Sequence, residues 1–170
     1  MHIEVVDNFN MIIYLNSAHS KLISNNKEDV QECFKNLFSK LKDYYNININ
    51  GFYNIKAFKD KYYGMILELS KEDIDYIEYF DGQVDMNITF ENNCTFLYEI
   101  DDYFDLDKKI IKNTKLYKYK GKFYIQIVKN ISSADIGKIM EFGKIIYDDM
   151  TKQIIKKGNI LEIDNNLEKL

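Results

Sequence analysis

The sequence contains no arginine, no proline and no tryptophan, so lysine is its main source of positive charge. Arginine is the residue that grips phosphate, carboxylate and guanine through a planar, two-pronged set of donors. Acidic residues outnumber lysines by 27 to 23 in the 170-residue chain, which gives a formal net charge of −4. We therefore expect no specific nucleic-acid partner, because such partners select for a basic, arginine-bearing surface.

Long hydrophobic runs are also missing, since the longest extends only from Met11 to Leu15. A membrane-spanning helix needs about 20 apolar residues. Glu4 and Asp7 lie where a secretory signal carries positive charge. These features predict a cytoplasmic protein with no membrane partner. The only cysteines are Cys33 and Cys94, which we expect to be reduced, with Cys33 packing as a small hydrophobe.

Residues arranged for catalysis are scarce as well. The two histidines are His2 and His19, and the sequence contains no G-x-S-x-G motif that would supply a nucleophilic serine. The histidines and cysteines also lack the spacing of zinc ligands. The seven glycines stand singly, so neither a Walker loop nor a dinucleotide-binding fingerprint is present. The sequence accordingly predicts a protein that is not an enzyme and has no cofactor and no metal site.

The chain does contain an internal repeat. Residues 55–80 match residues 116–142, with an offset of 61 positions at first and of 62 from Ser70 and Ser132 onward. A repeat of this length is one supersecondary unit used twice. Each copy has the pattern of a hairpin followed by a helix, so the two copies are expected to superpose. The turns are predicted at 59–61 and at Lys120-Gly121, the latter a pair suited to a tight hairpin.

Hydrophobic periodicity predicts the other elements. A stripe of apolar residues from Val30 to Tyr45 predicts a core-facing helix that Asn26 caps. Residues 3–6 and 11–15 predict either a strand pair or one long bent strand. Further expected elements are a helix over about 71–81, strands at 84–90 and 95–100 joined by a turn at 91–93, a brief helix within 101–112, and one long last helix from Ser132 or Ser133 to Gly158.

These elements define the expected fold class, which is α+β. Two related strand-helix-hairpin-helix units would form mostly antiparallel sheet with helices packed on one face. The first unit would cover residues 1–82 and the second residues 83–170. Because the sequence contains no linker rich in glycine or proline between them, we expect the two units to share one compact body.

The densest charge feature is an acidic segment with aromatic residues, which allows two interpretations. It is either a solvated loop or a docking patch in which aromatic side chains anchor a protein partner. It lacks the central glycine and the terminal glutamate of a calcium-binding loop. The candidate partner-binding residues are Tyr98, Asp101, Asp102, Tyr103, Phe104 and Asp105.

Several short motifs resemble the C-terminal domain of the MecA-type adaptor proteins of Firmicutes, which hand substrates to the ClpC unfoldase. They are Phe96-Leu-Tyr98 to Asp101-Asp-Tyr-Phe104-Asp105, then Thr114-Lys-Leu116-Tyr117 with Lys122-Phe123-Tyr124-Ile125, and Glu141-Phe-Gly-Lys-Ile-Ile146. The opening Met1-His-Ile3-Glu4 is similar to the start of that family's substrate-binding domain. The resemblance implies a non-catalytic adaptor that docks on a AAA+ unfoldase through its second half.

Two functions from different classes therefore lead, and a third, a small-molecule-binding or enzymatic fold, stays open but would need a deep pocket with converging polar groups. The first is a protein-protein interaction module without catalytic activity, such as an adaptor for a ClpC-type unfoldase and its substrates. The alternative is an acidic inhibitor that mimics nucleic acid and occupies the basic channel of a nucleic-acid-binding protein. Carboxylates such as Asp101 and Asp105 would then stand in for phosphates, and the binding would depend strongly on salt. The sequence makes no prediction of the oligomeric state.

Overall fold

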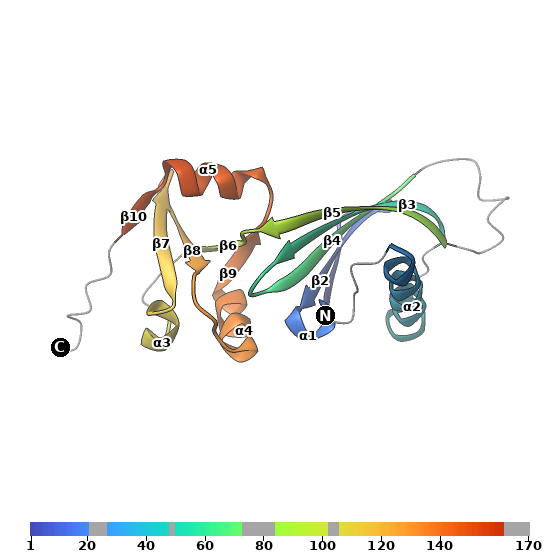
Figure 1. Cartoon of the computed structure of the whole chain (residues 1–170), viewed down its shortest axis with the longest axis horizontal. Helices are drawn as coiled ribbons and strands as arrows, with labels where there is room; N and C mark the ends of the chain where they lie inside the picture. The colour runs from blue at the N-terminus through green and yellow to red at the C-terminus, as the bar shows by residue number, and fades with distance from the viewer. Residues whose placement is uncertain (21–26, 48–49, 73–83, 102–105, 162–170) are drawn as a thin grey trace. The chain divides into compact units, whose positions relative to one another are not determined.

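A computed structural model describes residues 1–20, 27–47, 50–72, 84–101 and 106–161 (Figure 1). The chain divides into two compact units, the first formed by residues 1–59 and 64–93 and the second by residues 60–63 and 94–170. Each unit contains a five-stranded sheet and helices, which confirms the α+β class. The pairings of β1 with β2, of β2 with β4, and of the strands of unit 2 with one another are antiparallel.

The sheet of unit 1 has the strand order β1-β2-β4-β3-β5. Its strands are β1 (His2–Val5), β2 (Asn10–Asn16), β3 (Gly51–Asp60), β4 (Gly64–Lys71) and β5 (Val84–Cys94). The short helix α1 (Ser17–Ser20) follows β2. Strands β1 and β2 form a hairpin whose turn is held by Asp7, because its carboxylate accepts hydrogen bonds from the backbone of Phe9 and Asn10. Of the two interpretations of this segment, the strand pair is therefore confirmed.

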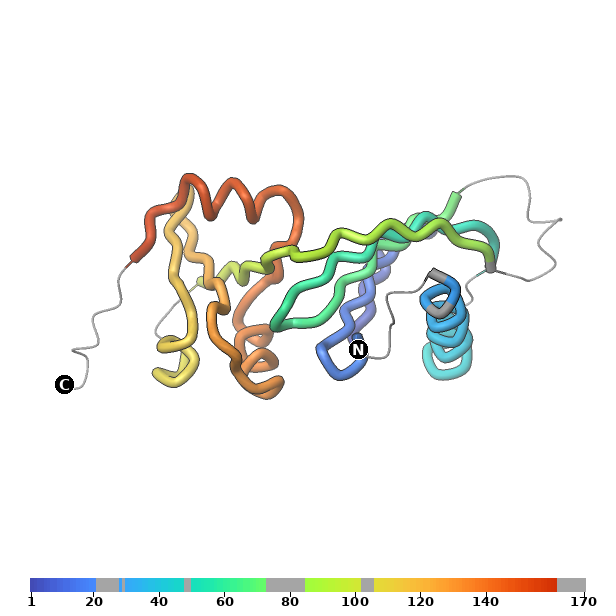
Figure 2. Tube along the Cα trace, viewed as in Figure 1, coloured from blue at the N-terminus to red at the C-terminus, as the bar shows by residue number. Residues whose placement is uncertain are grey.

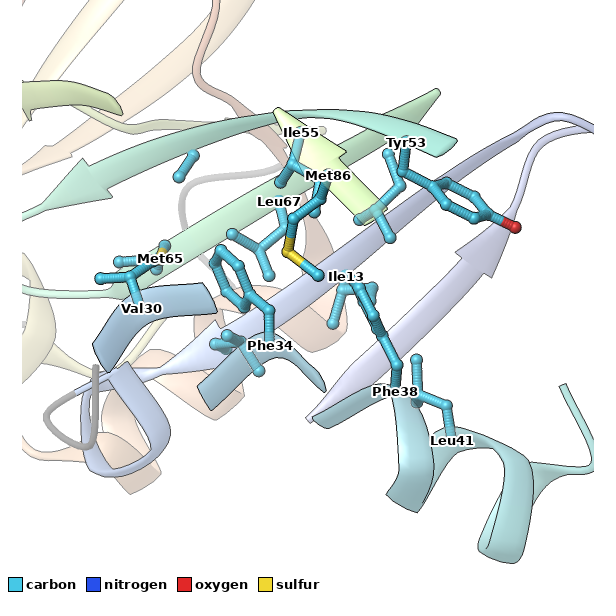
Figure 3. Close-up of a cluster of buried hydrophobic side chains, with 13 residues drawn as sticks. Ile13, Val30, Phe34, Phe38, Leu41, Tyr53, Ile55, Met65, Leu67 and Met86 are labelled. Atoms are coloured by element: carbon cyan, nitrogen blue, oxygen red, sulfur yellow. The ribbon is translucent and has the colours of Figure 1, made fainter. Parts of the chain in front are cut away.

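The helix α2 (Lys27–Tyr45) covers one face of this sheet. Its buried side chains point at the alternate residues of the strands that face it, such as Ile13 and Leu67 (Figure 3). The predicted stripe is thus core, because burying such a stripe removes its apolar surface from water. The stripe ends one turn earlier than expected, since Tyr44 is 80% exposed. The buried helix residues are Val30, Phe34, Phe38 and Leu41.

Gly64 marks a place where two strands approach closely. Its φ of +131° lies in the region that favours glycine, and a Cβ atom there would lie 2.4 Å from the carbonyl oxygen of Leu15. Strand β4 begins at this residue and pairs along β2, with Gly64 opposite Asn16 and Ser70 opposite Asn10. A side chain at Gly64 would therefore disturb the pairing of β4 with β2.

The sheet of unit 2 has the strand order β10-β7-β8-β6-β9. The path of the chain through it can be followed in Figure 2. Its elements are β6 (Leu97–Ile100), α3 (Lys108–Ile111), β7 (Thr114–Tyr119), β8 (Lys122–Ile127), α4 (Ser133–Phe142), β9 (Gly143–Ile146), α5 (Asp149–Lys157) and β10 (Asn159–Leu161). Ile154 of α5 packs on Leu97, Tyr117 and Tyr124. The brief helix within 101–112 is confirmed as α3.

The hairpin of β7 and β8 turns at Lys120-Gly121, as predicted. Both residues have positive φ, 49° and 81°, which is the geometry of a type I′ turn. The first hairpin, of β3 and β4, is also present, but its turn lies at residues 61–63 and not at 59–61, and Asp60 holds it by accepting from the backbone N–H groups of Tyr62 and Tyr63. The matching helix of the first copy falls within residues 73–83, outside the described residues, so the superposition of the two copies stays a prediction.

Two expected elements are wrong. The strands at 84–90 and 95–100 do not form a hairpin, because β5 lies beside β3 in unit 1 while β6 lies between β8 and β9 in unit 2. The reason is that Met86, Ile88 and Phe90 continue the apolar face that α2 covers. Strand β5 therefore belongs to unit 1, although the expected domain boundary precedes it.

The long last helix is also wrong, because the chain forms α4, then the strand β9, then α5. Gly143 ends α4 with an extended backbone, and residues 143–146 pair with β6, Lys144 opposite Glu99. Asp148 then caps α5 by accepting a hydrogen bond from the backbone N–H of Met150 at 2.9 Å. None of the described helices is both long and apolar enough to cross a lipid bilayer.

Candidate functional site

The helices α3 and α4 border a hollow of about 270 Å³ in unit 2, which we call the α3–α4 hollow. Its lining residues are Leu106, Asp107, Ile110, Lys138, Glu141 and Phe142. The first three come from α3 and the two residues before it, and the last three from α4. The hollow therefore depends on how each of these helices begins.

Helix α3 begins at Asp107, whose carbonyl oxygen accepts from the backbone N–H of Ile110 at 2.9 Å and of Ile111 at 3.1 Å. This turn places Ile110 in the interior with 1% exposure, and Leu106 is also buried. The same turn leaves the Asp107 side chain in solvent at the rim. The hollow thus has an apolar floor beside a charged edge.

Helix α4 begins with a reciprocal cap, which settles the choice between the two serines in favour of Ser132. The Ser132 hydroxyl accepts from the backbone N–H of Asp135 at 3.1 Å and donates to the Asp135 carboxylate at 2.6 Å. This pattern satisfies donors that a helix start otherwise leaves open. The hydrogen bond from Ser132 lowers the pKa of Asp135, and the charge of Lys109, at 3.5 Å, lowers it further.

A second ion pair joins the two walls of the hollow. The Lys138 ammonium lies 2.7 Å from the Asp107 carboxylate, and this hydrogen bond raises the pKa of Lys138. Both side chains are more than half exposed, and a pair of this kind contributes only about 0–1 kcal/mol to stability. The pair places the Lys138 ammonium of α4 beside the Asp107 carboxylate at the start of α3.

Phe142 is the exposed aromatic residue of the hollow. It is the last residue of α4 and is 51% exposed, although its neighbours Ile139 and Ile145 are buried. The next residue is Gly143, which lies close to two backbone carbonyl groups. A Cβ atom there would lie 2.9 Å from the carbonyl oxygen of Ile139 and 3.0 Å from that of Glu99, so glycine suits the point where the chain turns from α4 to β9. The chain must therefore leave the helix at Phe142 to pair with β6.

The sequence-predicted site residues are only partly described. Asp101 is exposed at the end of β6, and residues 102–105 lie outside the described residues. Tyr98 is 1% exposed, so its ring lies in the interior of unit 2 and offers no surface to a partner. Its burial follows from the interior position of β6 in the sheet, where Tyr98 lies opposite Ile125 of β8 and Ile145 of β9, which are both buried, and where Leu97 on the other face is buried as well. The predicted segment leads directly into Leu106 and the floor of the hollow.

The hydroxyl of Tyr98 has no hydrogen-bond partner in the part of the chain that the structure describes. Burial raises the pKa of Tyr98 well above its usual value, and the negative charge of Asp60 raises it further. Burial likewise raises the pKa of Tyr63 to about 12. The Asp60 carboxylate itself accepts from three backbone N–H groups, those of Tyr62 at 2.8 Å, Tyr63 at 2.7 Å and Phe96 at 3.2 Å.

Sequence reasoning missed most of the hollow. Leu106, Ile110 and Lys138 belong to no functional motif, and they come together with Asp107, a carboxylate of the acidic segment, only because α3 and α4 lie side by side. Glu141 and Phe142 entered the sequence interpretation through the E-F-G-K-I-I motif and the internal repeat. Among the described residues, no three histidine, cysteine, aspartate or glutamate side chains gather as a metal site would require.

Comparison with known proteins adds no relative to this picture. No family model, no curated protein and no solved structure matches the chain.

Proposed function

We propose that this chain is a non-catalytic protein-binding module that docks on its partner through the α3–α4 hollow. The observation that supports the proposal is Phe142, a half-exposed aromatic side chain beside a hollow with a buried apolar floor. Binding energy at protein interfaces concentrates in such aromatic anchors, which fill pockets and are ringed by polar residues. Here Asp107, Lys138 and Glu141 form that polar rim.

The partner that we propose is a AAA+ unfoldase of the ClpC type, which places the module in the cytoplasm as an adaptor. The support is the resemblance of residues 96–105 and 141–146 to the MecA-type adaptors, because Glu141 and Phe142 line the hollow and residue 105 precedes Leu106 of its floor in the sequence. A partner surface with an apolar patch would match Phe142 and this floor.

The direct test measures binding of the purified chain to a purified ClpC-type unfoldase by calorimetry at physiological salt. Phe142→Ala should weaken binding at least about tenfold, as expected for removal of an interface anchor. Tyr44→Ala is the matched control, because it removes another exposed aromatic side chain that lies in unit 1. We expect its affinity to equal that of the wild type.

The salt dependence of the same binding separates the two functional classes. An anchor-driven complex should lose little affinity between about 50 and 200 mM salt, whereas a nucleic-acid mimic in a basic channel should lose about a thousandfold or more. Asp101→Asn should then weaken the mimic and leave the anchored complex nearly unchanged. Absence of binding to the unfoldase, or equal affinities for Phe142→Ala and Tyr44→Ala, would overturn the proposal.

A further inference from the structure

The outer edge of unit 1 presents a second feature that the α3–α4 hollow does not involve. Strand β1 is the outermost strand of its sheet and pairs on one side with β2, His2 opposite Tyr14 and Val5 opposite Met11. On its other side, no strand pairs with β1 in the described part of the chain. An edge of this kind is a template for a further strand.

The hydrogen bonds of the turn show which backbone groups face outward. The N–H of Val6 donates to the carbonyl oxygen of Asn10, the residue opposite it, at 3.0 Å, so the backbone of Val6 faces β2, while the Asn10 N–H donates to Asp7. Hydrogen-bonded pairs alternate along an antiparallel ladder. The backbone groups of His2 and Glu4 therefore face β2, and those of Ile3 and Val5 face the open edge.

The edge also lacks the usual protection against pairing. Natural edge strands are blocked by lysine, proline or a bulge, and none of these interrupts His2–Val5. The strand instead ends in exposed apolar side chains, since Val5 is 60% and Val6 is 56% exposed, and Phe9 follows in the turn with 44% exposure. These side chains remain in water unless a partner covers them.

We propose that the occupant of this edge is β1 of a second copy of the chain, in an antiparallel pairing about a two-fold axis. Only residues with outward backbone groups can form the hydrogen-bonded pairs. The register that places Ile3 opposite Ile3 of the second copy, and Val5 opposite Met1, meets this condition. Two copies would then join their sheets into one, with the same surface used by both, as closed dimers require.

Charge selects this register over its neighbour. With Ile3 opposite Ile3, His2 lies opposite Glu4 of the second copy twice over, in the pairs whose side chains are closest. A shift of one strand by two residues against the other would place Glu4 opposite Glu4, and like charges directly opposite each other are destabilising. The favoured register therefore pairs each acidic side chain of β1 with a histidine.

The side chains that would meet are already held in place. The Tyr14 hydroxyl donates to the Glu4 carboxylate at 3.1 Å, and the rings of His2 and Tyr14 lie 5.5 Å apart. His2 and Glu4 thus share one face of the sheet, with Tyr14 between them. Because both side chains are positioned before pairing, less conformational entropy is lost when the second copy binds.

Sedimentation equilibrium of the full chain, tagged only at its C-terminus, tests the pairing. The wild type should show a concentration-dependent dimer below about 100 µM, within the micromolar range of modest interfaces. Ile3→Pro removes an outward N–H and should give a monomer with an unchanged circular dichroism spectrum, because proline is tolerated at strand edges. Glu4→Lys should weaken the dimer at least about tenfold, because the carboxylate opposite His2 is lost, and the double variant His2→Glu/Glu4→Lys should restore it, since a carboxylate and an ammonium group then face each other.

Cysteine variants identify the register. His2→Cys and Glu4→Cys proteins should each remain monomeric on a non-reducing gel, and a mixture of the two should give a band of twice the chain mass. Wild type, with Cys33 and Cys94 present, is the background control. A wild type that sediments as a monomer at about 100 µM, a band from Glu4→Cys alone, or no rescue by the double variant would each overturn the proposal.

Discussion

The carboxylate of Asp60 accepts a hydrogen bond from the backbone N–H of Phe96 at 3.2 Å, although 36 residues separate them in the sequence. Its other oxygen accepts from Tyr62 and Tyr63. One short side chain thus satisfies three backbone donors inside unit 2.

Asp60→Ala should therefore lower the free energy of unfolding by about 1–3 kcal/mol, because buried donors left without acceptors carry a full desolvation cost. Asp60→Asn keeps one acceptor oxygen and should cost less. Amide hydrogen exchange checks this residue by residue, and the Phe96 amide should exchange faster in Asp60→Ala. Unchanged protection of that amide would show that the hydrogen bond contributes nothing.

The hydroxyl of Tyr98, which has no hydrogen-bond partner among the described residues, predicts an unusual substitution. Tyr98→Phe removes a buried group that forms no hydrogen bond within that part of the chain, so stability at pH 7 should be unchanged or higher by about 1 kcal/mol. Tyr117→Phe is the matched control, since the Tyr117 hydroxyl donates to Gln126 at 2.8 Å. The control should lose about 1 kcal/mol in urea denaturation.

The buried residues Tyr63 and Tyr98 predict how the stability of the fold changes at alkaline pH. Burial raises the pKa values of Tyr63 and Tyr98 in the folded state, to about 12 for Tyr63, whereas an unfolded tyrosine titrates near 10. The contribution of Tyr63 is complete below about pH 10 and is lost as pH rises from 10 to 12, and the contribution of Tyr98 also begins to be lost above about pH 10. Tyr98→Phe should reduce this loss, and identical alkaline melting profiles for the two proteins would contradict the assignment.

Two glycines of the α4 region should respond oppositely to alanine. Gly143→Ala places a Cβ atom 2.9 Å from the carbonyl oxygen of Ile139 and 3.0 Å from that of Glu99, so it should destabilise by about 1–3 kcal/mol. Gly137→Ala lies within α4 and meets nothing within 4 Å, so it should stabilise by about 0.5–1 kcal/mol. Thermal unfolding measures both, and shifts of the same sign would refute the geometry.

Removal of the Ser132 cap should shorten or loosen α4. Ser132→Ala should cost about 1 kcal/mol, whereas Ser133→Ala, at the neighbouring exposed serine, should cost almost nothing. The pKa of Asp135 is lowered in the folded state, chiefly by the Ser132 hydrogen bond. Its contribution is therefore present above about pH 4 and is lost as pH falls through the lowered pKa. The difference in the free energy of unfolding between Ser132→Ala and the wild type should become smaller in acid. Urea denaturation at a series of acidic pH values checks this.

Local patterns predicted the elements whose partners lie nearby in the sequence. The stripe of α2 from Val30 to Leu41, the Lys120-Gly121 turn and the serine cap of α4 each follow from period, turn chemistry or capping. The wrong predictions at β5 and at β9 have one cause, because each strand pairs with a strand that is distant in the sequence, β5 with β3 and β9 with β6. Gly143–Ile146 continues a helical apolar pattern, but its pairing with β6 is a long-range effect that periodicity does not contain.

The candidate site was less predictable for the same reason. The acidic segment from Asp101 stood out by charge, but Ile110 and Lys138 are ordinary residues until α3 and α4 bring them together. Tyr98 was grouped with the segment by its position, whereas β6 is an interior strand on which Leu97 and Tyr98, on opposite faces, are both buried. That position in the sheet depends on pairing with β8 and β9, which lie later in the sequence.

The make-up of unit 2 limits how this protein can be dissected. The unit includes residues 60–63, which precede most of it in the chain by more than thirty positions. A fragment that starts at Cys94 would lack the Asp60 carboxylate and the Tyr63 ring, which lies 5.8 Å from the ring of Phe96. During synthesis, the ribosome finishes this small piece long before the rest of its unit emerges. A protein expressed from residue 94 onward would therefore lack part of its unit unless residues 60–63 are joined to it.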